Sequence, residues 1–210
     1  VPSWLTFDAT TGILAGTPLN ANVGANSVVI TINDGTVDVT DTFTITVANT
    51  NDAPTFTSTA VTAVDEDAAY SYTAAASDDD GDTVTLAGTT IPAWMTFDAT
   101  TGALTGTPTN AEVGSHTVVI TASDTNSAST AHTFTVVVAN TNDAPVVTST
   151  AVTAVDEDAA YSYTVTATDV DVGDTLTMTG TTVPSWLTFD ATTGILAGTP
   201  LNANVGANSV

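Results

Sequence analysis

Three recurring clusters of acidic and amide side chains are the parts of this chain whose residue types and spacing could do chemistry. Residues 65–67 read Asp-Glu-Asp, residues 78–82 read Asp-Asp-Asp-Gly-Asp, and residues 49–52 read Asn-Thr-Asn-Asp. Asp-x-Asp spacing in a loop lets two carboxylates converge on one ion, while Asn and backbone carbonyls add neutral oxygens. The chemistry that these clusters predict is the binding of a hard cation, of which Ca²⁺ is the common one.

The overall charge agrees with a cation as partner. All 23 charged side chains are acidic, and the absence of Lys and Arg gives a formal net charge of −23. A chain without a basic residue cannot neutralise phosphates, which argues against nucleic acid and against anionic lipid head groups. The absence of cysteine excludes disulfides and thiolate metal sites. No apolar run approaches the roughly 20 residues that span a bilayer, so we expect no membrane insertion in this segment.

The clusters return at a fixed distance because the chain is a tandem repeat. Residues 62–73 reappear unchanged as residues 153–164, 91 positions later. Residues 183–210 are identical to residues 1–28, whereas the copy between them differs at several positions. Two types of unit therefore alternate along the chain.

This periodicity divides the chain into three parts, which we name the first, second and third repeat. We expect residues 1–54 to form the C-terminal part of one repeat, residues 55–145 a complete repeat, and residues 146–210 the N-terminal part of another. Outer parts of this kind would expose unpaired strand edges. We therefore expect neighbouring sequence or another copy to complete them.

The second repeat has a β pattern throughout. Runs rich in Thr and Val lie between clusters of Gly, Pro, Asn and Asp, for example residues 69–76, 83–87, 117–123 and 133–139. In the first repeat, residues 33–35 read Asn-Asp-Gly and mark a hairpin turn. About seven strands in about 90 residues, with no helical periodicity, predict immunoglobulin-like Greek-key β-sandwiches in a linear array.

The motifs resemble those of cadherin-like tandem repeats over essentially the whole chain. Residues 76–81 and 167–171 are similar to the Asp-Ala-Asp motif of cadherin repeats, and residues 51–54 (Asn-Asp-Ala-Pro) are similar to the linker between them. Residues 1–12 and 16–18 are closer still to dystroglycan-type and bacterial immunoglobulin-type cadherin-like repeats.

The resemblance implies that Ca²⁺ binds where two repeats join, with ligands from the preceding repeat, the linker and the following repeat. The implied ligands are Asn49, Asn51, Asp52, Asp78 and Asp80 for the first joint, Glu66, Asn140, Asn142, Asp143, Asp169 and Asp171 for the second, and Glu157 for a joint beyond residue 210. The family's Leu-Asp-Arg-Glu motif is absent and the linker is shorter, so fewer ions and a Kd of about 10⁻⁴–10⁻³ M are expected. The alternative is that these residues are solvated turns, because Asp and Asn form turns readily.

Repetition of the acids argues against an enzyme. A glycosidase needs two carboxylates across a cleft, whereas these acids stand in turns and recur in every copy. We expect an extracellular structural or adhesive array, such as a stalk, adhesin shaft or filament at a cell surface, that Ca²⁺ stiffens at its joints. Its partners would be neighbouring repeats, other copies of itself, and cell-surface or polysaccharide ligands. Two alternatives stay open, a carbohydrate-binding accessory module of a secreted polysaccharide-processing protein and homophilic adhesion through strand edges.

We expect structural roles for the three tryptophans and the two histidines. Trp4, Trp94 and Trp186 each begin the phrase Trp-(Leu/Met)-Thr-Phe-Asp-Ala-Thr-Thr-Gly. A Trp in this setting is typical of a sandwich core, although a sugar-binding platform is the alternative. His116 and His132 occur only in the second repeat, and we expect them at surface positions of strands.

Overall fold

The computed structural model describes residues 1–210. It divides into two compact units, one formed by residues 1–108 and 114–138 and the other by residues 109–113 and 139–210. Strands account for nearly all regular structure, and the only helices are three short 3-10 turns. These are η1 (Asn20–Asn22), η2 (Asn110–Glu112) and η3 (Asn202–Asn204). The predicted all-β class is confirmed.

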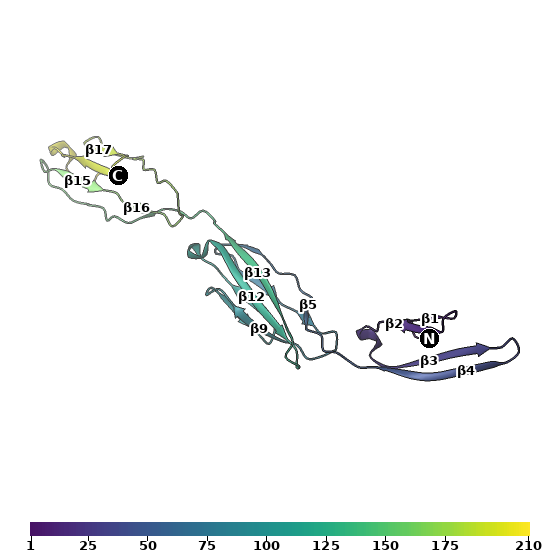
Figure 1. Cartoon of the computed structure of the whole chain (residues 1–210). Coiled ribbons are helices and arrows are strands. Elements are labelled where there is room, and N and C mark those ends of the chain that lie inside the picture. Colours follow the sequence, from purple (N-terminus) through teal and green to yellow (C-terminus); the bar gives the residue numbers. More distant parts are fainter. The chain divides into compact units, whose positions relative to one another are not determined.

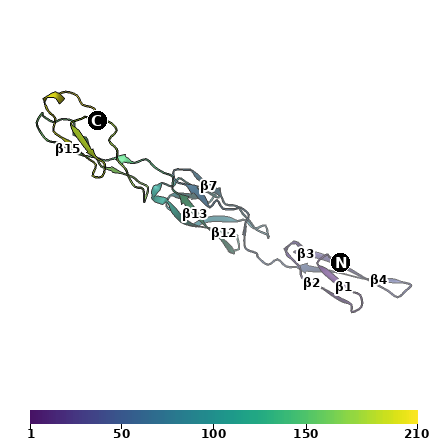
Figure 2. The ribbon, with the colours of Figure 1, turned by 90° about the horizontal axis from the view of Figure 1, so that it is seen from above.

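The second repeat is a sandwich of two antiparallel sheets (Figures 1 and 2). One sheet has the strand order β6-β13-β12-β9 and the other the order β10-β11-β7. The strands are β6 (Ala63–Asp65), β7 (Tyr70–Thr73), β9 (Thr85–Thr90), β10 (Met95–Asp98), β11 (Ala103–Gly106), β12 (Gly114–Ser123) and β13 (Ser129–Ala139). A short pair, β5 (Thr55–Phe56) with β8 (Ala76–Ser77), stands beside them. The predicted β-sandwich is therefore confirmed for this repeat.

Strand bounds differ from the predicted runs where pairing overrides composition. The predicted strand 133–139 begins at Ser129, because the register carries Ser123 opposite Ser129 and extends the ladder through Ala and Ser. The predicted strand 69–76 splits into β7 and β8, which pair with different partners. Strand propensity depends on the neighbouring residues across the sheet. The composition of a single run does not reveal those neighbours.

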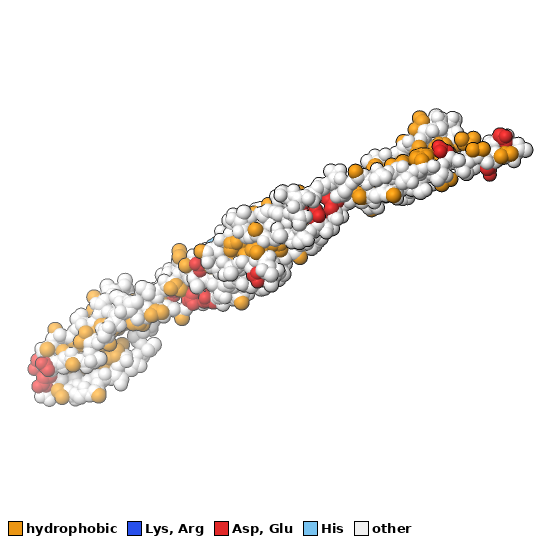
Figure 3. All heavy atoms as spheres, turned by 90° about the horizontal axis from the view of Figure 1, so that it is seen from below, with side chains coloured by type: hydrophobic (Ala, Val, Ile, Leu, Met, Phe, Trp, Pro, Cys, Tyr) orange, Lys and Arg blue, Asp and Glu red, His pale blue; other side chains and the backbone are white.

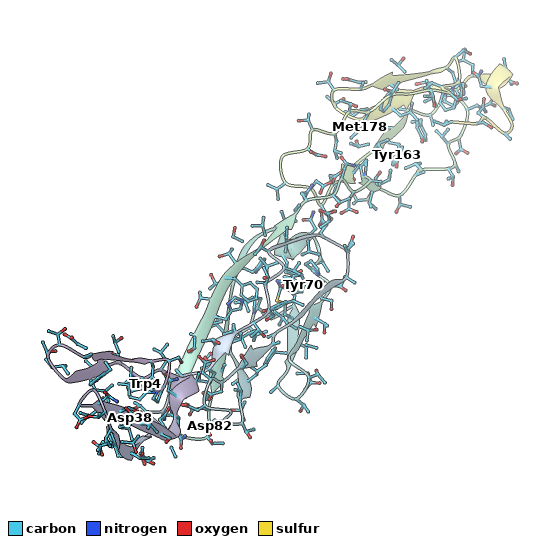
Figure 4. The ribbon with its side chains drawn as sticks, turned by 90° about the vertical axis from the view of Figure 1, so that its right-hand side faces the viewer. Trp4, Asp38, Tyr70, Asp82, Tyr163 and Met178 are labelled. Atoms are coloured by element: carbon cyan, nitrogen blue, oxygen red, sulfur yellow. The ribbon has the colours of Figure 1, made fainter.

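The core lies between the two sheets. Leu104 of β11, Ile120 of β12 and Val136 of β13 are fully buried, and they alternate along their strands with less buried residues. Tyr70 and Tyr72 of β7 pack against them, and Figure 4 shows Tyr70 inside the repeat. Burial of this many apolar side chains is the main stabilising term in a domain without disulfides.

Each core tyrosine keeps a hydrogen bond at its polar tip. The Tyr70 hydroxyl donates to the Val61 carbonyl at 2.8 Å, and the Tyr72 hydroxyl lies 2.7 Å from Ser58 Oγ. Burial raises the pKa of Tyr70 to about 12, with a smaller contribution from Tyr72. The two hydroxyl groups therefore tie the segment 58–61 to the core.

The tryptophan of the repeated phrase packs against this core. The rings of Trp94 and Tyr70 form an edge-to-face contact with centroids 5.9 Å apart, and Trp186 and Tyr161 repeat it in the third repeat. A Cβ atom built on Gly106 would lie 2.4 Å from the Trp94 carbonyl oxygen. The glycine is thus required by the close approach of β10 and β11, and the core interpretation of Trp94 is confirmed.

The expectation that both histidines lie on the surface is wrong. The His132 ring stacks on Phe56 with centroids 4.9 Å apart, and it also contacts Phe134. The His116 ring packs edge-to-face on Trp94 at 5.7 Å. Both residues stand at inward positions of their strands, since His132 lies opposite the buried Ile120 and His116 lies opposite the buried Val136. They therefore fill core space, as aromatic rings do elsewhere.

The acidic residue of the phrase Asp-Ala-Thr-Thr-Gly closes a tight turn between β10 and β11. Asp98 Oδ1 accepts hydrogen bonds from the Thr100 N–H at 2.8 Å and the Thr101 N–H at 3.4 Å. These bonds and that from the Thr101 hydroxyl hold the pKa of Asp98 below its usual value. Gly102 takes the left-handed conformation (φ 73°) that ends the turn. Such acids are turn residues rather than candidate ligands.

The first and third repeats contain subsets of the same elements. The first holds β1 (Leu5–Asp8), β2 (Ile13–Gly16) and the long hairpin β3 (Gly24–Asn33) and β4 (Asp38–Val47), which pair in register along their whole length. The third holds β14 (Val146–Val147), β15 (Tyr161–Thr164), β16 (Ala167–Thr168), β17 (Leu187–Asp190) and β18 (Ile195–Gly198). The repeat boundaries at residues 54 and 145 stay a prediction.

Candidate metal centre

Three segments build an acidic cluster at one end of the second repeat, the linker 49–54, the loop 78–84 after β8, and the turn 124–128 between β12 and β13. Asp78 organises the loop, because its Oδ1 accepts the N–H groups of Asp80 at 2.9 Å and Asp82 at 3.3 Å. Gly81 allows the bend with φ 79°. Figure 4 labels Asp82 at this end of the repeat.

The linker is held against the loop by a backbone donor. The Asp52 N–H donates to Asp80 Oδ2 at 2.7 Å, across 28 positions of sequence. The side chain of Asn51 reaches the turn, where its Nδ2 donates to Asp124 Oδ2 at 2.8 Å. Four of the five residues implied for the first joint, namely Asn51, Asp52, Asp78 and Asp80, are thus brought together.

Asp124 is a member of the cluster that sequence reasoning missed. It is only 8% exposed, and its Oδ1 accepts the N–H groups of Asn126 at 2.9 Å and Ala128 at 2.8 Å. The hydrogen bond from Asn51 is the largest of the causes that hold its pKa below the usual value. A signal was available in the sequence, because Asp34 follows the same Val-Val-Ile-Thr strand in the first repeat. The Asn-Asp-Gly sequence around Asp34 by itself indicates only a hairpin turn.

Asn126 links the linker to the acidic loop through its amide. Its Nδ2 donates to Asn51 Oδ1 at 2.7 Å and to Asp82 Oδ2 at 2.6 Å. Because the chain has no Lys or Arg, its side chains can offer a carboxylate only neutral hydrogen-bond donors of this kind at neutral pH, apart from the two histidines. They leave the net charge of the cluster unchanged.

Two carboxylate oxygens of the cluster remain without a donor. Asp78 Oδ2 and Asp80 Oδ1 are buried and accept no hydrogen bond. A buried polar atom without a partner costs free energy, and a carboxylate oxygen costs more than a neutral one. A hard cation with oxygen ligands would satisfy both atoms. The donor set therefore fits Ca²⁺, with Asp78 and Asp80 as the residues that would hold it, and with Asn51, Asp52 and Asp124 beside them.

The second unit contains a similar cluster. The carboxylate oxygens of Asp169, Asp171 and Asp174 lie within 4.8 Å of one another, and Asp171 is 6% exposed. The Asp143 N–H donates to Asp171 Oδ2 at 2.7 Å, and the Asp171 N–H donates to Asp169 Oδ1 at 3.0 Å. These two bonds repeat those of the first cluster 91 residues earlier, so the loop geometry belongs to the repeat.

An amide again contributes a donor to the second cluster. Asn110 Nδ2 donates to Asp171 Oδ1 at 3.0 Å and lies 3.4 Å from Asn140 Oδ1. Asn110 was not among the predicted residues, because it stands in the 3-10 turn η2, far from every acidic motif in the sequence.

The remaining predicted ligands have different surroundings. Asn142 Nδ2 donates to the Asp143 carbonyl at 2.7 Å and shapes the linker. Asn49 and Glu157 are exposed and make no hydrogen bond to either cluster. Glu66 is buried, and its role as a ligand stays a prediction. Figure 3 shows the Asp and Glu side chains gathered in a few separate groups.

Sandwich repeats that share an acidic loop and an Asn-Asp-Ala-Pro linker define a tandem array of immunoglobulin-like, cadherin-like domains. The chain belongs to the family described as "Putative Ig domain", whose model matches residues 1–48, 53–139 and 144–210. The predicted family resemblance is therefore confirmed.

A curated relative is the serine-rich adhesin for platelets of Staphylococcus aureus. It is 29% identical over 119 residues, which are 56% of this chain and 5% of the adhesin. The chain therefore spans only a small part of the curated relatives that it matches.

Two solved structures illustrate the structural similarity. The extracellular domain of protocadherin gamma B4 matches with a TM-score of 0.51 and 19% identity, over 99% of this chain and 40% of that one, which supports the fold. An endo-fucoidan hydrolase of glycoside hydrolase family 107 matches with 25% identity over 98% of this chain and 34% of that one. The TM-score of this match is 0.38. Within the chain, none of the helices is long and apolar enough to cross a membrane.

Proposed function

We propose that this chain is a non-enzymatic structural or adhesive segment of a cell-surface protein, and that Ca²⁺ stiffens the joints between its repeats. The adhesin relative and the protocadherin fold support an extracellular, surface-bound role. A stalk, adhesin shaft or filament is the form of protein in which many similar repeats act in series.

The observation that carries the cation proposal is the pair of buried carboxylate oxygens without a donor, Asp78 Oδ2 and Asp80 Oδ1. They stand in a cluster that also holds the nearly buried Asp124. With no basic side chain in the whole chain, a bound cation is the compensation that remains for this charge.

The linker explains how a bound ion would stiffen the joint between two repeats. Its backbone already donates to the loop, through the bond from the Asp52 N–H to Asp80. Without a cation, repulsion among the acids of the loop opposes this contact. A cation held by Asp78 and Asp80 removes the repulsion, so that closing the linker onto the loop and binding the ion favour each other. At a free Ca²⁺ concentration of 100 times Kd, one such site stabilises the folded state by about 2.7 kcal/mol.

Thermal unfolding of the chain in EDTA and in millimolar Ca²⁺ tests the proposal. The wild-type chain is expected to melt at a higher temperature in Ca²⁺, and Asp80→Asn is expected to lose most of this increase. Asp98→Asn is the matched control, because it removes the same charge from an exposed turn outside the cluster. An identical melting temperature of the wild type in EDTA and Ca²⁺ would show that the clusters are solvated turns.

Carbohydrate binding lacks a comparable observation. The candidate sugar platform, Trp94, packs its ring against Tyr70 and His116 within the core. A platform for sugar rings needs an exposed aromatic face, so we retain the structural role as the conclusion.

A further inference from the structure

A 3-10 turn stands at the same place in every repeat, and its first residue is an asparagine. The turns η1, η2 and η3 begin at Asn20, Asn110 and Asn202. In η2, the Thr109 N–H donates to Glu112 Oε2 at 2.8 Å, and the Glu112 N–H donates to the Thr109 carbonyl at 2.9 Å. The other two turns repeat this pair of bonds. The local structure therefore holds the asparagine in a defined position.

In the second unit this asparagine reaches a carboxylate that lies far away in the sequence. Residues 109–113, which contain η2, group with residues 139–210 rather than with the rest of the second repeat. Asn110 Nδ2 donates to Asp171 Oδ1 at 3.0 Å, across 61 positions. The other oxygen of the same carboxylate, Oδ2, accepts the Asp143 N–H at 2.7 Å. The nearly buried Asp171 therefore has a neutral donor at each of its two oxygens.

The first unit contains the same groups with one bond open. The Asp52 N–H donates to Asp80 Oδ2 at 2.7 Å, which repeats the backbone bond of the second unit. Asp80 Oδ1 has no donor and Asn20 Nδ2 has no acceptor, although both atoms are buried. These two atoms correspond to the bonded pair of the second unit, Asn110 Nδ2 and Asp171 Oδ1. A buried donor and a buried acceptor that both lack a partner favour the formation of the bond.

We propose that Asn20 and Asn110 are latches that hold the joints between repeats closed without an ion. In each joint the side-chain amide of the 3-10 turn donates to an aspartate of the following acidic loop, which is Asp80 in the first joint and Asp171 in the second. The first latch is open in this structure and the second is closed. The closed bond is a strong one, because its acceptor is a carboxylate.

The latch and Ca²⁺ compete for the same carboxylate oxygen. The amide N–H and the ion both approach Asp171 Oδ1 with positive charge, so they repel each other. A closed latch therefore lowers the apparent affinity for Ca²⁺, because the ion binds only to the fraction of joints in which the latch is open. An asparagine that acted as a ligand would instead raise the affinity. The competition rests on the proposed Ca²⁺ site, whereas closure by the amide does not.

Distance measurements across the second joint in EDTA test closure by the amide. The natural chain holds no cysteine, so spin labels can be attached at Thr133→Cys and Thr192→Cys, two exposed positions in the second and third repeats. Double electron–electron resonance then measures the distribution of distances between the labels. Asn110→Ala should broaden this distribution, because the joint loses the bond. Asn202→Ala is the matched control, since it removes the exposed asparagine of η3, and it should leave the distribution unchanged.

A second variant separates loss of the bond from loss of side-chain volume. Asn110→Asp keeps the size of the side chain, removes the N–H donor and places a second carboxylate beside Asp171. We expect a distribution in EDTA that is broader than that of Asn110→Ala, because the two carboxylates repel each other.

Calorimetric titration with Ca²⁺ tests the competition. All chains carry Asp80→Asn, which weakens the first site, so that the second site dominates the titration. Asn110→Ala should then lower the Kd of the second site. The decrease is about tenfold for a latch that is closed about nine-tenths of the time. Asn202→Ala should leave this Kd unchanged.

Two kinds of result would overturn the inference. The first is a distance distribution in EDTA that Asn110→Ala leaves unchanged, or that Asn202→Ala broadens equally. The second is a Kd for Ca²⁺ that stays the same or rises in Asn110→Ala, since a rise would make the asparagine a ligand. If the wild-type chain binds no Ca²⁺, the proposed function and the competition both fail, and the distances in EDTA alone decide whether the amide closes the joint.

Discussion

Asn51 and Asp124 lie 73 positions apart in the sequence and are joined by a hydrogen bond of 2.8 Å from Nδ2 to Oδ2. This bond connects the linker before the second repeat to the turn at the far end of β12. The amide of Asn126 closes the arrangement by donating to Asn51 Oδ1. One asparagine of the linker is therefore bonded twice to the turn, and Asn126 of that turn also donates to Asp82 of the acidic loop.

Replacement of this asparagine should weaken the junction. In Asn51→Ala, the nearly buried carboxylate of Asp124 loses a donor, and we expect a lower melting temperature in EDTA. Asn51→Asp should be less stable still in EDTA, because a second carboxylate faces Asp124, and it should recover more in Ca²⁺ than the wild type does. Asn49→Ala is the control, since Asn49 is an exposed residue of the same linker that makes no hydrogen bond to the cluster. Equal melting of all four proteins in EDTA would contradict the role of the bond.

Sequence reasoning identified the loop residues of the site and missed its turn. Asp78 and Asp80 were predictable because Asp-x-Asp spacing and a 91-residue period are local properties that a single sequence displays. Asp124 and Asn110 reach the clusters through the fold, from a hairpin turn and a 3-10 turn that carry no acidic motif. The two histidines were misplaced for a similar reason, because the side of the sheet that they face depends on the register between β12 and β13.

The ionisation of Tyr70 should make the second repeat sensitive to alkali. Burial raises the pKa of this phenol to about 12 from a usual value of 10. A raised pKa means that the neutral form stabilises the fold fully below pH 10, and that this contribution is lost as the pH rises toward 12. Tyr70→Phe should be less stable at neutral pH by about 1 kcal/mol, because the Val61 carbonyl loses its donor.

The same variant should show a weaker dependence of unfolding free energy on pH between 10 and 12. Denaturant unfolding at a series of pH values, followed by tryptophan fluorescence, measures both effects. A wild-type protein whose stability falls no faster than that of Tyr70→Phe over this range would contradict the assignment to Tyr70.

The close approach of β10 and β11 predicts that one methyl group added at position 106 strongly lowers the stability of the repeat. A Cβ atom at position 106 would stand 2.4 Å from the Trp94 carbonyl oxygen, so the backbone at one of the two positions would have to shift. We expect Gly106→Ala to destabilise the repeat by about 1–3 kcal/mol, as overpacked cores do. Thr105→Ala, at an exposed position of the same strand, should change stability by less than about 0.5 kcal/mol. Chemical denaturation of both variants measures the difference.

The partner of the repeated tryptophan differs between the two types of unit, and this difference predicts a stabilising substitution. Trp4 Nε1 donates to Asn26 Oδ1 at 3.0 Å, and Trp186 Nε1 donates to Asn208 Oδ1 at 3.3 Å. In the second repeat the corresponding position is His116, and the buried Trp94 Nε1 has no hydrogen-bond acceptor. His116→Asn should supply the acceptor and stabilise the repeat by about 0.5–1.5 kcal/mol.

The loss of the edge-to-face contact between the His116 and Trp94 rings opposes this gain, so a double-mutant cycle is needed to isolate the hydrogen bond. The second substitution is Trp94→Phe, which keeps an aromatic ring and removes the indole N–H. His116→Asn should stabilise the chain that holds Trp94 more than the chain that holds Phe at that position. An equal effect in both backgrounds would show that the new asparagine does not bond to the indole, and that the two types of repeat differ here only in packing.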